Sequence, residues 1–472
     1  MRSLLCIPLS VFLLTACVSS PTTTPQEAKI VPRALGLDGA RMPVIADTWW
    51  KSFGDPKLDA LVGESLRDNP SLKIALARVR GAQSQLAASI AQTYPQATFD
   101  GDVERERLSK DYIIPPPYGG TMRWVGTLQA NLSYSLDLFG KEQDQIDRAR
   151  ASARAASLDA EAARLLLAGS VTQAYIALSR AWALSDVAEE AVREREGVLK
   201  LSAGRVGAGL DTLASQRQAE ALLAISREEL IRAKAARDIA VHQIAALAGH
   251  GADAYDIPRP ALNDAALGLP EKLPADLLAR RADVAAAEER VDAAMSGREI
   301  ARKAFYPDVN LIALAGTAAI GLDPLFSSEA GQYGAGGAIH LPIFDAGTLR
   351  AQYAGATADL DESVADYNNA VVGAVKQVSD DITNLNAVTG QAAQQRAARK
   401  AAQQSFDLAT KRYRSGLNPL QTALDAESVL IQAERDDAAL SADRASAQVS
   451  LLMTLGGGFD AAKMNSKDDD HE

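Results

Sequence analysis

Two stretches of helical periodicity in this sequence are far longer than the helices of an ordinary globular domain. One runs from about Lys141 to Arg205, and a second runs from Asp211 to Ala248 after a turn marked by Gly207 and Gly209. At about 1.5 Å per residue, the first helix alone would be on the order of 100 Å long if unbroken. A compact domain does not need such a helix, whereas coiled-coil architecture does. The chain is therefore expected to pack long helices along one another.

Other segments alternate with a period of two and predict strands. Every second residue of Phe99–Glu104 is charged, and apolar and polar residues alternate strictly over the ten positions of Leu128–Asp137. Similar strand-like runs occupy about 309–320 and 333–344. This pattern gives each strand one apolar and one polar face.

The second half of the chain repeats the order of the first. A helix expected over 56–93 stops at Tyr94-Pro95, and one over 275–304 stops at Tyr306-Pro307. Two strands, a very long helix (347–414 in the second half) and a last helix (419–455) follow in each case. Three further pairs of landmarks recur 207 positions apart. Gly209 matches Gly416, and Leu247-Ala248-Gly249 matches Thr454-Leu455-Gly456. Asp211 matches Asn418, and each of these two residues is expected to open a long helix. The sequence predicts a tandem internal repeat.

Four amphipathic strands cannot close a barrel on their own, because small closed barrels need about eight strands or more. An apolar outer face with a polar inner face is typical of a membrane barrel. No stretch after the N-terminal segment reaches the roughly 18 apolar residues of a transmembrane helix, and Leu311–Leu322 is the nearest. We therefore expect several copies of the chain to build one barrel together, with the long helices bundled into a tube beneath it.

The first 16 residues have the features of a secretory signal, with Arg2 ahead of an apolar stretch over Leu4–Leu14. The sequence LTAC at 14–17 resembles the lipobox of bacterial lipoproteins. This resemblance implies cleavage before Cys17 and attachment of diacylglycerol to its thiol, with palmitate among the acyl chains. Val18 replaces the aspartate that signals retention at the inner membrane, which implies delivery to the outer membrane. The alternative is an ordinary signal peptide followed by a chance cysteine.

Composition argues against several other functions. The chain has 49 Lys and Arg against 60 Asp and Glu, a net charge of −11, which disfavours nucleic acid as a partner. Its two cysteines lie within the first twenty residues and its four histidines are scattered, so no zinc cluster or Cys/His catalytic pair can be built. Acidic pairs such as Glu189-Glu190 diverge by about 100° on a helix and are expected to be solvated. We expect no enzyme activity, no catalytic or metal-binding residues, and no cofactor besides the lipid on Cys17.

Several motifs, in this order and spacing, are similar to those of the TolC-like outer-membrane efflux proteins, specifically the NodT-type lipoprotein branch. The similarity covers nearly all of the chain after the signal. Its most specific pieces are WWKSFGDP (49–56), NPSL (69–72), LDLFG (136–140), RRADV (280–284), LPIFDAG (341–347) and RYRSG (412–416).

This resemblance implies an α+β membrane protein that assembles as a homotrimer in the outer membrane. Each chain would give four strands to a twelve-stranded transmembrane β-barrel above a long α-helical coiled-coil barrel in the periplasm. A periplasmic adaptor protein and an inner-membrane pump, of the RND type, would be its partners, and drugs or other small toxic compounds would pass through passively. The alternatives are the exit duct of a type I protein secretion system and a structural coiled-coil lipoprotein that spans no membrane.

The resemblance also implies where a gate would lie. In this family the periplasmic tip closes near the start of the last helix, where aspartates form rings around the threefold axis. The ring position falls on Asp425, and a second acidic position found in some members falls on Thr422, so one ring is missing. An Arg–Asp brace used by some members is absent, because Asn418 and Ser215 occupy its places. Tyr413 is then the candidate for the polar contacts that control opening.

Each gate assignment has an alternative that involves no gate. Asp425 could be a solvated helical charge, and Asn418 is better explained as the N-cap ahead of Pro419. Trp49 and Trp50 are expected to pack and to anchor the N-terminal segment rather than to bind a ligand.

The predicted domain layout follows from these elements. It comprises a lipoprotein signal (1–16), a lipid-anchored tether (17–55), a first efflux repeat (56–250), an irregular connection (251–274), a second efflux repeat (275–458) and an acidic, disordered tail (459–472).

Overall fold

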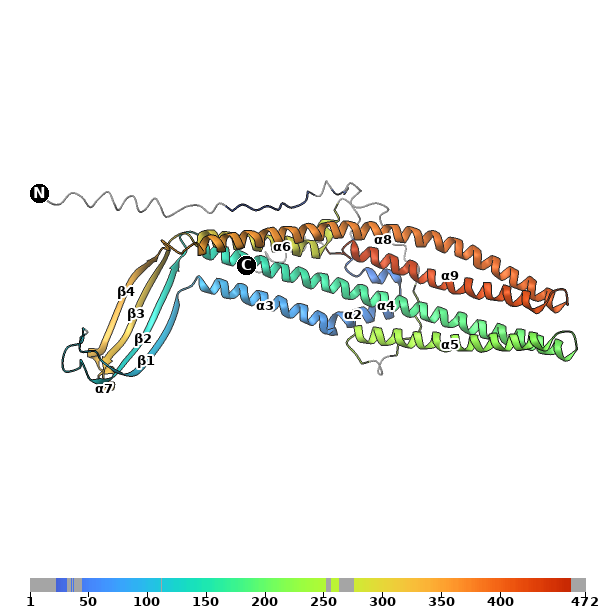
Figure 1. Cartoon of the computed structure of the whole chain (residues 1–472), viewed down its shortest axis with the longest axis horizontal. Coiled ribbons are helices and arrows are strands. Elements are labelled where there is room, and N and C mark those ends of the chain that lie inside the picture. The colour runs from blue at the N-terminus through green and yellow to red at the C-terminus, as the bar shows by residue number, and fades with distance from the viewer. Residues whose placement is uncertain are drawn as a thin grey trace. The chain divides into compact units, whose positions relative to one another are not determined.

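The structure is a computed structural model that describes residues 23–31, 35, 37, 45–111, 113–251, 256–262 and 276–459. The signal segment, Cys17 and the acidic tail beyond Phe459 therefore lie outside the described residues. Helices dominate, and four strands form one sheet (Figure 1). Within the described residues, no helix has an apolar stretch long enough to cross a membrane.

The first half of the chain contains the short 3-10 helix η2, four α-helices and two strands. They are η2 (Trp49–Phe53), α2 (Pro56–Asp68), α3 (Pro70–Gln92), β1 (Gln96–Arg107), β2 (Met122–Leu136), α4 (Lys141–Gly207) and α5 (Leu213–Leu247). The long helix expected over 141–205 is confirmed. Strand β1 extends beyond its alternating segment at both ends, whereas β2 begins six residues before its segment and ends one residue short of Asp137.

The single helix expected over 56–93 is wrong, because the chain breaks at Asn69 into α2 and α3. Asn69 has an extended backbone (φ −62°, ψ 125°), as the residue before a proline prefers. Its Oδ1 accepts the N–H of Ser71 at 2.8 Å and its Nδ2 donates to the carbonyl oxygen of Leu247 at 2.8 Å. The break therefore begins α3 and fixes it to the end of α5.

The second half has the same order of major elements. It contains α6 (Ala282–Lys303), β3 (Asp308–Ile320), β4 (Gly331–His340), α8 (Thr348–Arg414) and α9 (Leu420–Thr454), with the short helices η4 (Leu278–Arg280), α7 (Leu322–Leu325) and η5 (Ser328–Ala330) between them. Helices α4 and α8 are both 67 residues long, and α5 and α9 are both 35 residues long.

Two boundaries in this half differ clearly from the expectation, and one short helix is additional. Helix α6 begins at Ala282 rather than near 275, because Arg281 is held extended by bonds from its guanidinium to Asp283 and to the carbonyl oxygen of Thr454. Strand β4 ends at His340 rather than 344, since His340 pairs with Asp308, the first residue of β3. The connection between β3 and β4 contains α7, a helix that was not expected from the sequence.

The sheet is antiparallel throughout and has the order β1-β2-β3-β4. Strands β1 and β4 are its two edges. The four strand ends nearest the long helices join α3, α4, α6 and α8, while the connections at the other end, the free end, carry the loop after β1 and α7 (Figure 1).

Contacts divide the chain into two compact units. The first contains the sheet and the adjoining helix ends (Val79–Ala156 and Ala287–Tyr367), together with the segment up to Lys29. Here the backbone N–H groups of Gln26 and Glu27 donate to Asp361 of α8 at 2.8 and 3.0 Å. Lys303 of α6 forms an ion pair with Asp144 of α4 at 2.7 Å.

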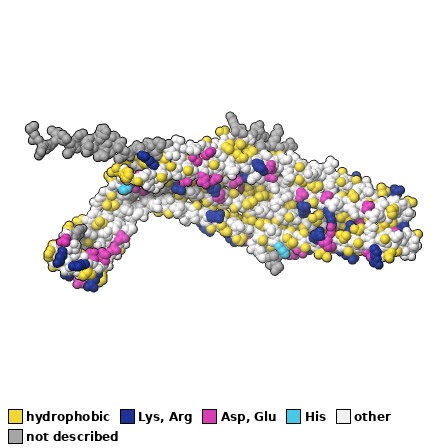
Figure 2. Space-filling view, viewed as in Figure 1, with side chains coloured by type: hydrophobic (Ala, Val, Ile, Leu, Met, Phe, Trp, Pro, Cys, Tyr) yellow, Lys and Arg dark blue, Asp and Glu magenta, His cyan; other side chains and the backbone are white. Residues whose placement is uncertain are grey.

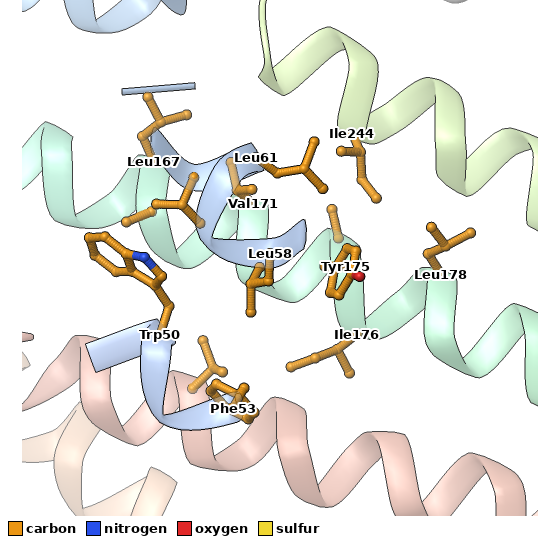
Figure 3. Packing of buried hydrophobic residues seen from close by; sticks show 14 of the residues in the cluster. Trp50, Phe53, Leu58, Leu61, Leu167, Val171, Tyr175, Ile176, Leu178 and Ile244 are labelled. Carbon is orange, nitrogen blue, oxygen red and sulfur yellow. The ribbon is translucent and has the colours of Figure 1, made fainter. Parts of the chain in front are cut away.

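The second unit (Ile30–Arg78, Ser157–Ala286 and Asn368–Glu472) contains the main apolar core. Helix α2 and η2 lie at its centre, against α4, and Trp50, Phe53 and Leu58 are almost completely buried there (Figure 3). Trp49 is buried as well, so both tryptophans pack as expected. The carboxylate of Asp55 accepts a hydrogen bond from the Tyr175 hydroxyl at 2.7 Å, and this bond ties the start of α2 to α4. This core joins α4, α5 and α9, and a second cluster that contains Val378 and Leu451 packs α8 against α9.

Candidate functional site

The candidate site lies in the second unit, at the two turns that join the long helices. The turn after α4 contains Gly209 at φ 72°, and the turn after α8 contains Gly416 at φ 73°. In both turns a backbone N–H reaches back five residues, from Leu210 to Arg205 and from Leu417 to Arg412, each at 2.9 Å. Glycine tolerates the left-handed conformation that this helix ending requires. The two halves therefore reverse direction in the same way.

A small apolar cluster packs the four helices together beside these turns. It contains Val198 of α4, Ala219 of α5, Ala409 and Tyr413 of α8, and Leu420, Ala423 and Leu424 of α9. Tyr413 is 1% exposed and is the largest side chain in the cluster.

Tyr413 joins the apolar cluster to a charged pair. Its hydroxyl donates to Oδ2 of Asp211 at 2.7 Å, and its ring lies beneath Arg205, with Cζ 4.9 Å from the ring centroid. Arg205 Nε lies 3.7 Å from the same Oδ2 of Asp211. We call these three residues the turn triad. The triad links the turn after α4 to the end of α8.

Electrostatics favour one protonation state of the triad. Burial alone would raise the pKa of Asp211, but hydrogen bonds from the Tyr413 hydroxyl, the Thr212 N–H and the Ser215 hydroxyl, together with the charge of Arg205, hold it below its usual value. Burial and the bond to Asp211 raise the pKa of Tyr413. At neutral pH Asp211 is therefore ionised and Tyr413 is a hydrogen-bond donor.

The structure brings together some of the residues singled out from the sequence and separates others. Tyr413 lies in the triad, and Ser215 bonds to the Thr212 cap, with their hydroxyl oxygens 3.0 Å apart. Thr422 and Asp425 are exposed on α9, where Asp425 accepts a bond from Gln421 at 2.7 Å.

The interpretation of Asp211 and Asn418 as the residues that open the last helices is wrong by one position. The N-cap of α5 is Thr212, whose hydroxyl accepts the N–H of Ser215 at 3.2 Å, and that of α9 is Pro419, which has no side-chain cap. Asp211 instead turns its carboxylate toward Tyr413.

Sequence reasoning missed the role of Arg205 entirely. Asn418 and Ser215 form no Arg–Asp pair, but Arg205 and Asp211 form one within a single turn. The only local signal was an arginine five residues before Leu210, and nothing in the sequence distinguished it from the other arginines of α4.

A second charged group lies nearby in the same unit. Glu427 of α9 is completely buried, and Nε of Arg195 on α4 lies 3.6 Å from its Oε2. Neither carboxylate oxygen accepts a hydrogen bond from a described residue. Burial raises the pKa of Glu427 to about 7 against the opposing charge of Arg195, and burial and the charge of Glu427 raise that of Glu194 to about 7. These helices therefore bind a proton close to neutral pH.

Comparison with known proteins assigns the chain to a family. The family model described as "Outer membrane efflux protein" matches residues 61–250 and 273–457. The chain belongs to the outer membrane efflux protein family. The resemblance noted in the sequence is thus confirmed, and the model matches each half of the chain separately.

Individual relatives agree with the family assignment. The chain is 36% identical to the fusaric acid resistance protein FusA of Burkholderia cepacia, over 73% of this chain and 67% of that protein. It is 30% identical to the pyoverdine export outer membrane protein OpmQ of Pseudomonas putida, with 98% of each covered. Among solved structures, the outer membrane protein VceC of Vibrio cholerae is 32% identical and superposes with a TM-score of 0.82, covering 88% of this chain and all of that one.

These likenesses establish the class of protein. The fold is that of the TolC-like outer-membrane channels, mostly helical with a small sheet. The protein is an outer-membrane component of an efflux system. Its family is one of channel proteins, and the turn triad is part of the channel's helical region.

Proposed function

We propose that the chain forms a homotrimeric exit duct through which drugs or other small toxic compounds leave the cell passively. An inner-membrane pump, of the RND type, would supply the energy through a periplasmic adaptor. The observation that carries this proposal is a four-stranded sheet with one largely apolar face, all of its acidic residues on the other face, and two open edges, in a chain of this family.

The faces of the sheet suit a shared barrel. Phe99, Val103 and Leu128 lie on the apolar face, whereas Asp100 and Asn131 lie on the other and share a hydrogen bond of 2.7 Å. Edge strands β1 and β4 have one unpaired side each, and four strands are too few to close. Three copies would join these edges into a twelve-stranded barrel with the acidic face around water.

The repeated order of elements supports a tandem duplication, with repeats over 56–250 and 275–458. The equal lengths of α4 and α8 and of α5 and α9 are what a duplicated unit would retain. Three duplicated chains would supply twelve long helices for the tube below the barrel.

The turn triad is a suitable latch for the narrow end of that tube. It ties the turn between α4 and α5 to the C-terminal end of α8 through a hydrogen bond to a charged group, which is stronger than a neutral hydrogen bond. Exposed Asp425 and Thr422, three copies of each around an axis, would line the opening, and three like charges there would attract cations.

Cys17 would carry an N-acyl diacylglycerol anchor in the outer membrane. The lipobox-like LTAC sequence supports this. Several acyl chains together hold a protein firmly, since each buried CH₂ contributes about 0.8 kcal/mol.

The class of substrate is inferred from relatives. FusA is named for fusaric acid resistance, OpmQ for pyoverdine export and MdtQ for multidrug resistance. Each name points to small molecules, which favours efflux over the export of proteins.

Single-channel conductance of the purified protein in planar bilayers tests the proposal. We expect heat-sensitive trimers that conduct, and crosslinking in cells should capture a periplasmic adaptor. Monomers without conductance would overturn the trimeric duct, and capture of a protein-secretion adaptor would overturn the substrate class.

A further inference from the structure

The apolar face of the sheet carries only two charged side chains within its four strands. The register places alternate residues of β1 on this face together with Trp124 and Leu128 of β2, Leu311 of β3 and Tyr333 of β4. The two charged members are Arg105 and Arg107, and both belong to β1. All acidic residues of the strands lie on the opposite face, at Asp100, Asp102, Glu104, Glu106 and Asp308.

Both arginines lie at the free end of the sheet. Arg105 pairs with Trp124 and Arg107 with Met122, the first strand residues after the loop that joins β1 to β2. Lys and Arg side chains gather at this end in the space-filling view (Figure 2). We call Arg105, Arg107, Met122 and Trp124 the rim.

The rim arginines have no anionic partner among the described residues. Arg105 Cζ lies 6.0 Å from the centroid of the Trp124 ring, and both arginines are exposed. Neither forms an ion pair with a described carboxylate, although the chain has more acidic than basic residues. Two cations are thus presented together on a face that is otherwise apolar.

Apolar groups continue directly beside the rim. Met122 and Trp124 are 53% and 42% exposed. Helix α7 lies against Gly126 on the same face, since a Cβ on that glycine would come within 2.8 Å of Leu325. Phe326, next to α7, is 80% exposed. The rim therefore combines exposed aromatic and aliphatic groups with two guanidinium groups.

We propose that the rim binds the phosphate groups of the glycolipid that forms the outer leaflet of the outer membrane. This inference rests on the proposed function, because only a barrel with periplasmic helices turns the free end of the sheet toward that leaflet. Guanidinium groups bind phosphate in bidentate fashion, and the neighbouring apolar groups suit the acyl chains below the phosphates. A tryptophan between these two zones is typical of a membrane interface.

The purified trimer in detergent provides the test. The probes are diphosphoryl lipid A and its dephosphorylated form, and binding of each is measured by native mass spectrometry. Since one arginine near an anionic lipid surface contributes about fivefold in affinity, the wild type should prefer the diphosphoryl form by roughly 25-fold. Arg105→Gln and Arg107→Gln should each weaken its binding about fivefold.

Arg123→Gln is the matched control. Arg123 pairs with Glu106 and so lies at the same height on the opposite face, with its guanidinium 5.5 Å from the Tyr118 ring. Binding should be unchanged in this variant, and inorganic phosphate at equal concentration should not displace the lipid. Equal affinity for the two forms of lipid A, equal losses in Arg123→Gln and Arg105→Gln, or displacement by inorganic phosphate would each overturn the proposal.

Conductance of the same preparations separates this inference from the proposed function. Conducting trimers without a preference for phosphorylated lipid would refute the rim alone, whereas a failure to form conducting trimers would refute the duct. The comparison of the two lipids uses wild-type protein, so it decides the matter even where a variant fails to fold.

Discussion

Replacing Tyr413 by phenylalanine tests whether the turn triad keeps the helical end of the channel closed. The ring would stay in the apolar cluster and beneath Arg205, so packing is preserved. Only the hydroxyl that donates to Asp211 at 2.7 Å is lost. Asp211 keeps the N–H of Thr212 at 2.8 Å and the neighbouring Arg205, so its charge remains partly compensated.

The magnitude follows from these remaining contacts. A hydrogen bond to a charged group contributes about 1.5–3 kcal/mol, and the partial compensation favours the lower end of this range. A loss of about 1.5 kcal/mol per protomer is roughly a tenfold shift toward the open state, or about a thousandfold if three protomers open together.

The assay is single-channel conductance in planar bilayers. Tyr413→Phe should conduct more than the wild type, through longer or larger openings. Tyr353→Phe is the matched control, because Tyr353 is also on α8, is 3% exposed, and lies beneath Arg298 at 4.9 Å, but is 60 residues from Tyr413. Equal conductance of the wild type and both variants would refute the role of the triad as a latch.

Three further predictions concern other parts of the chain. Asp425→Ala should weaken block of the channel by multivalent cations. Asp436→Ala is the control and should not, because Asp436 accepts the same kind of bond from a glutamine four residues earlier but lies about three turns away along α9. Equal block of the wild type and Asp425→Ala would exclude the ring of aspartates. The raised pKa of Glu427, about 7, should by itself lower the free energy of unfolding by about 3 kcal/mol as the pH rises from about 4.5 to above 7, because the folded state binds an extra proton in this window. Glu194 adds a change of the same sign, so Glu427→Gln should reduce the pH dependence in denaturant titrations, and an unchanged slope would contradict the assignment. Cys17→Ala should abolish labelling by radioactive palmitate while conductance is retained, and a retained label would place the lipid elsewhere.

Periodicity predicted the architecture well because helices and strands are local features. The expected end of α4 at Arg205 lies two residues from the observed end at Gly207, and the alternation in Leu128–Asp137 lies almost entirely within β2. The break at Asn69 was missed although Pro70 is a strong local signal, because the apolar pattern continues through it. Here a backbone restriction outweighs side-chain periodicity.

The candidate site could be predicted only in part, because its contacts join distant segments. Tyr413 was identified, but its hydrogen bond to Asp211 spans 202 positions and depends on how the turn after α4 packs against α8. Asp211 was interpreted as a cap because its sequence position fits one. Thr212, the next residue, is the N-cap instead, and the carboxylate of Asp211 accepts the hydrogen bond of the Tyr413 hydroxyl.

The partners of the charged groups indicate what each end of the chain contacts. At the helical turns, Asp211 accepts the hydrogen bond of the Tyr413 hydroxyl and lies 3.7 Å from Nε of Arg205, so its charge is compensated within one chain. At the sheet rim, Arg105 and Arg107 are exposed on a face that contains no acidic residue, so in a lipid leaflet their counter-charge would come from outside the chain. An internal pair suits a latch that opens and closes, whereas unpaired cations above an apolar band suit a fixed position in a lipid leaflet. In the proposed trimer, the turn triad would therefore be the part that moves and the rim would be the part that anchors the barrel.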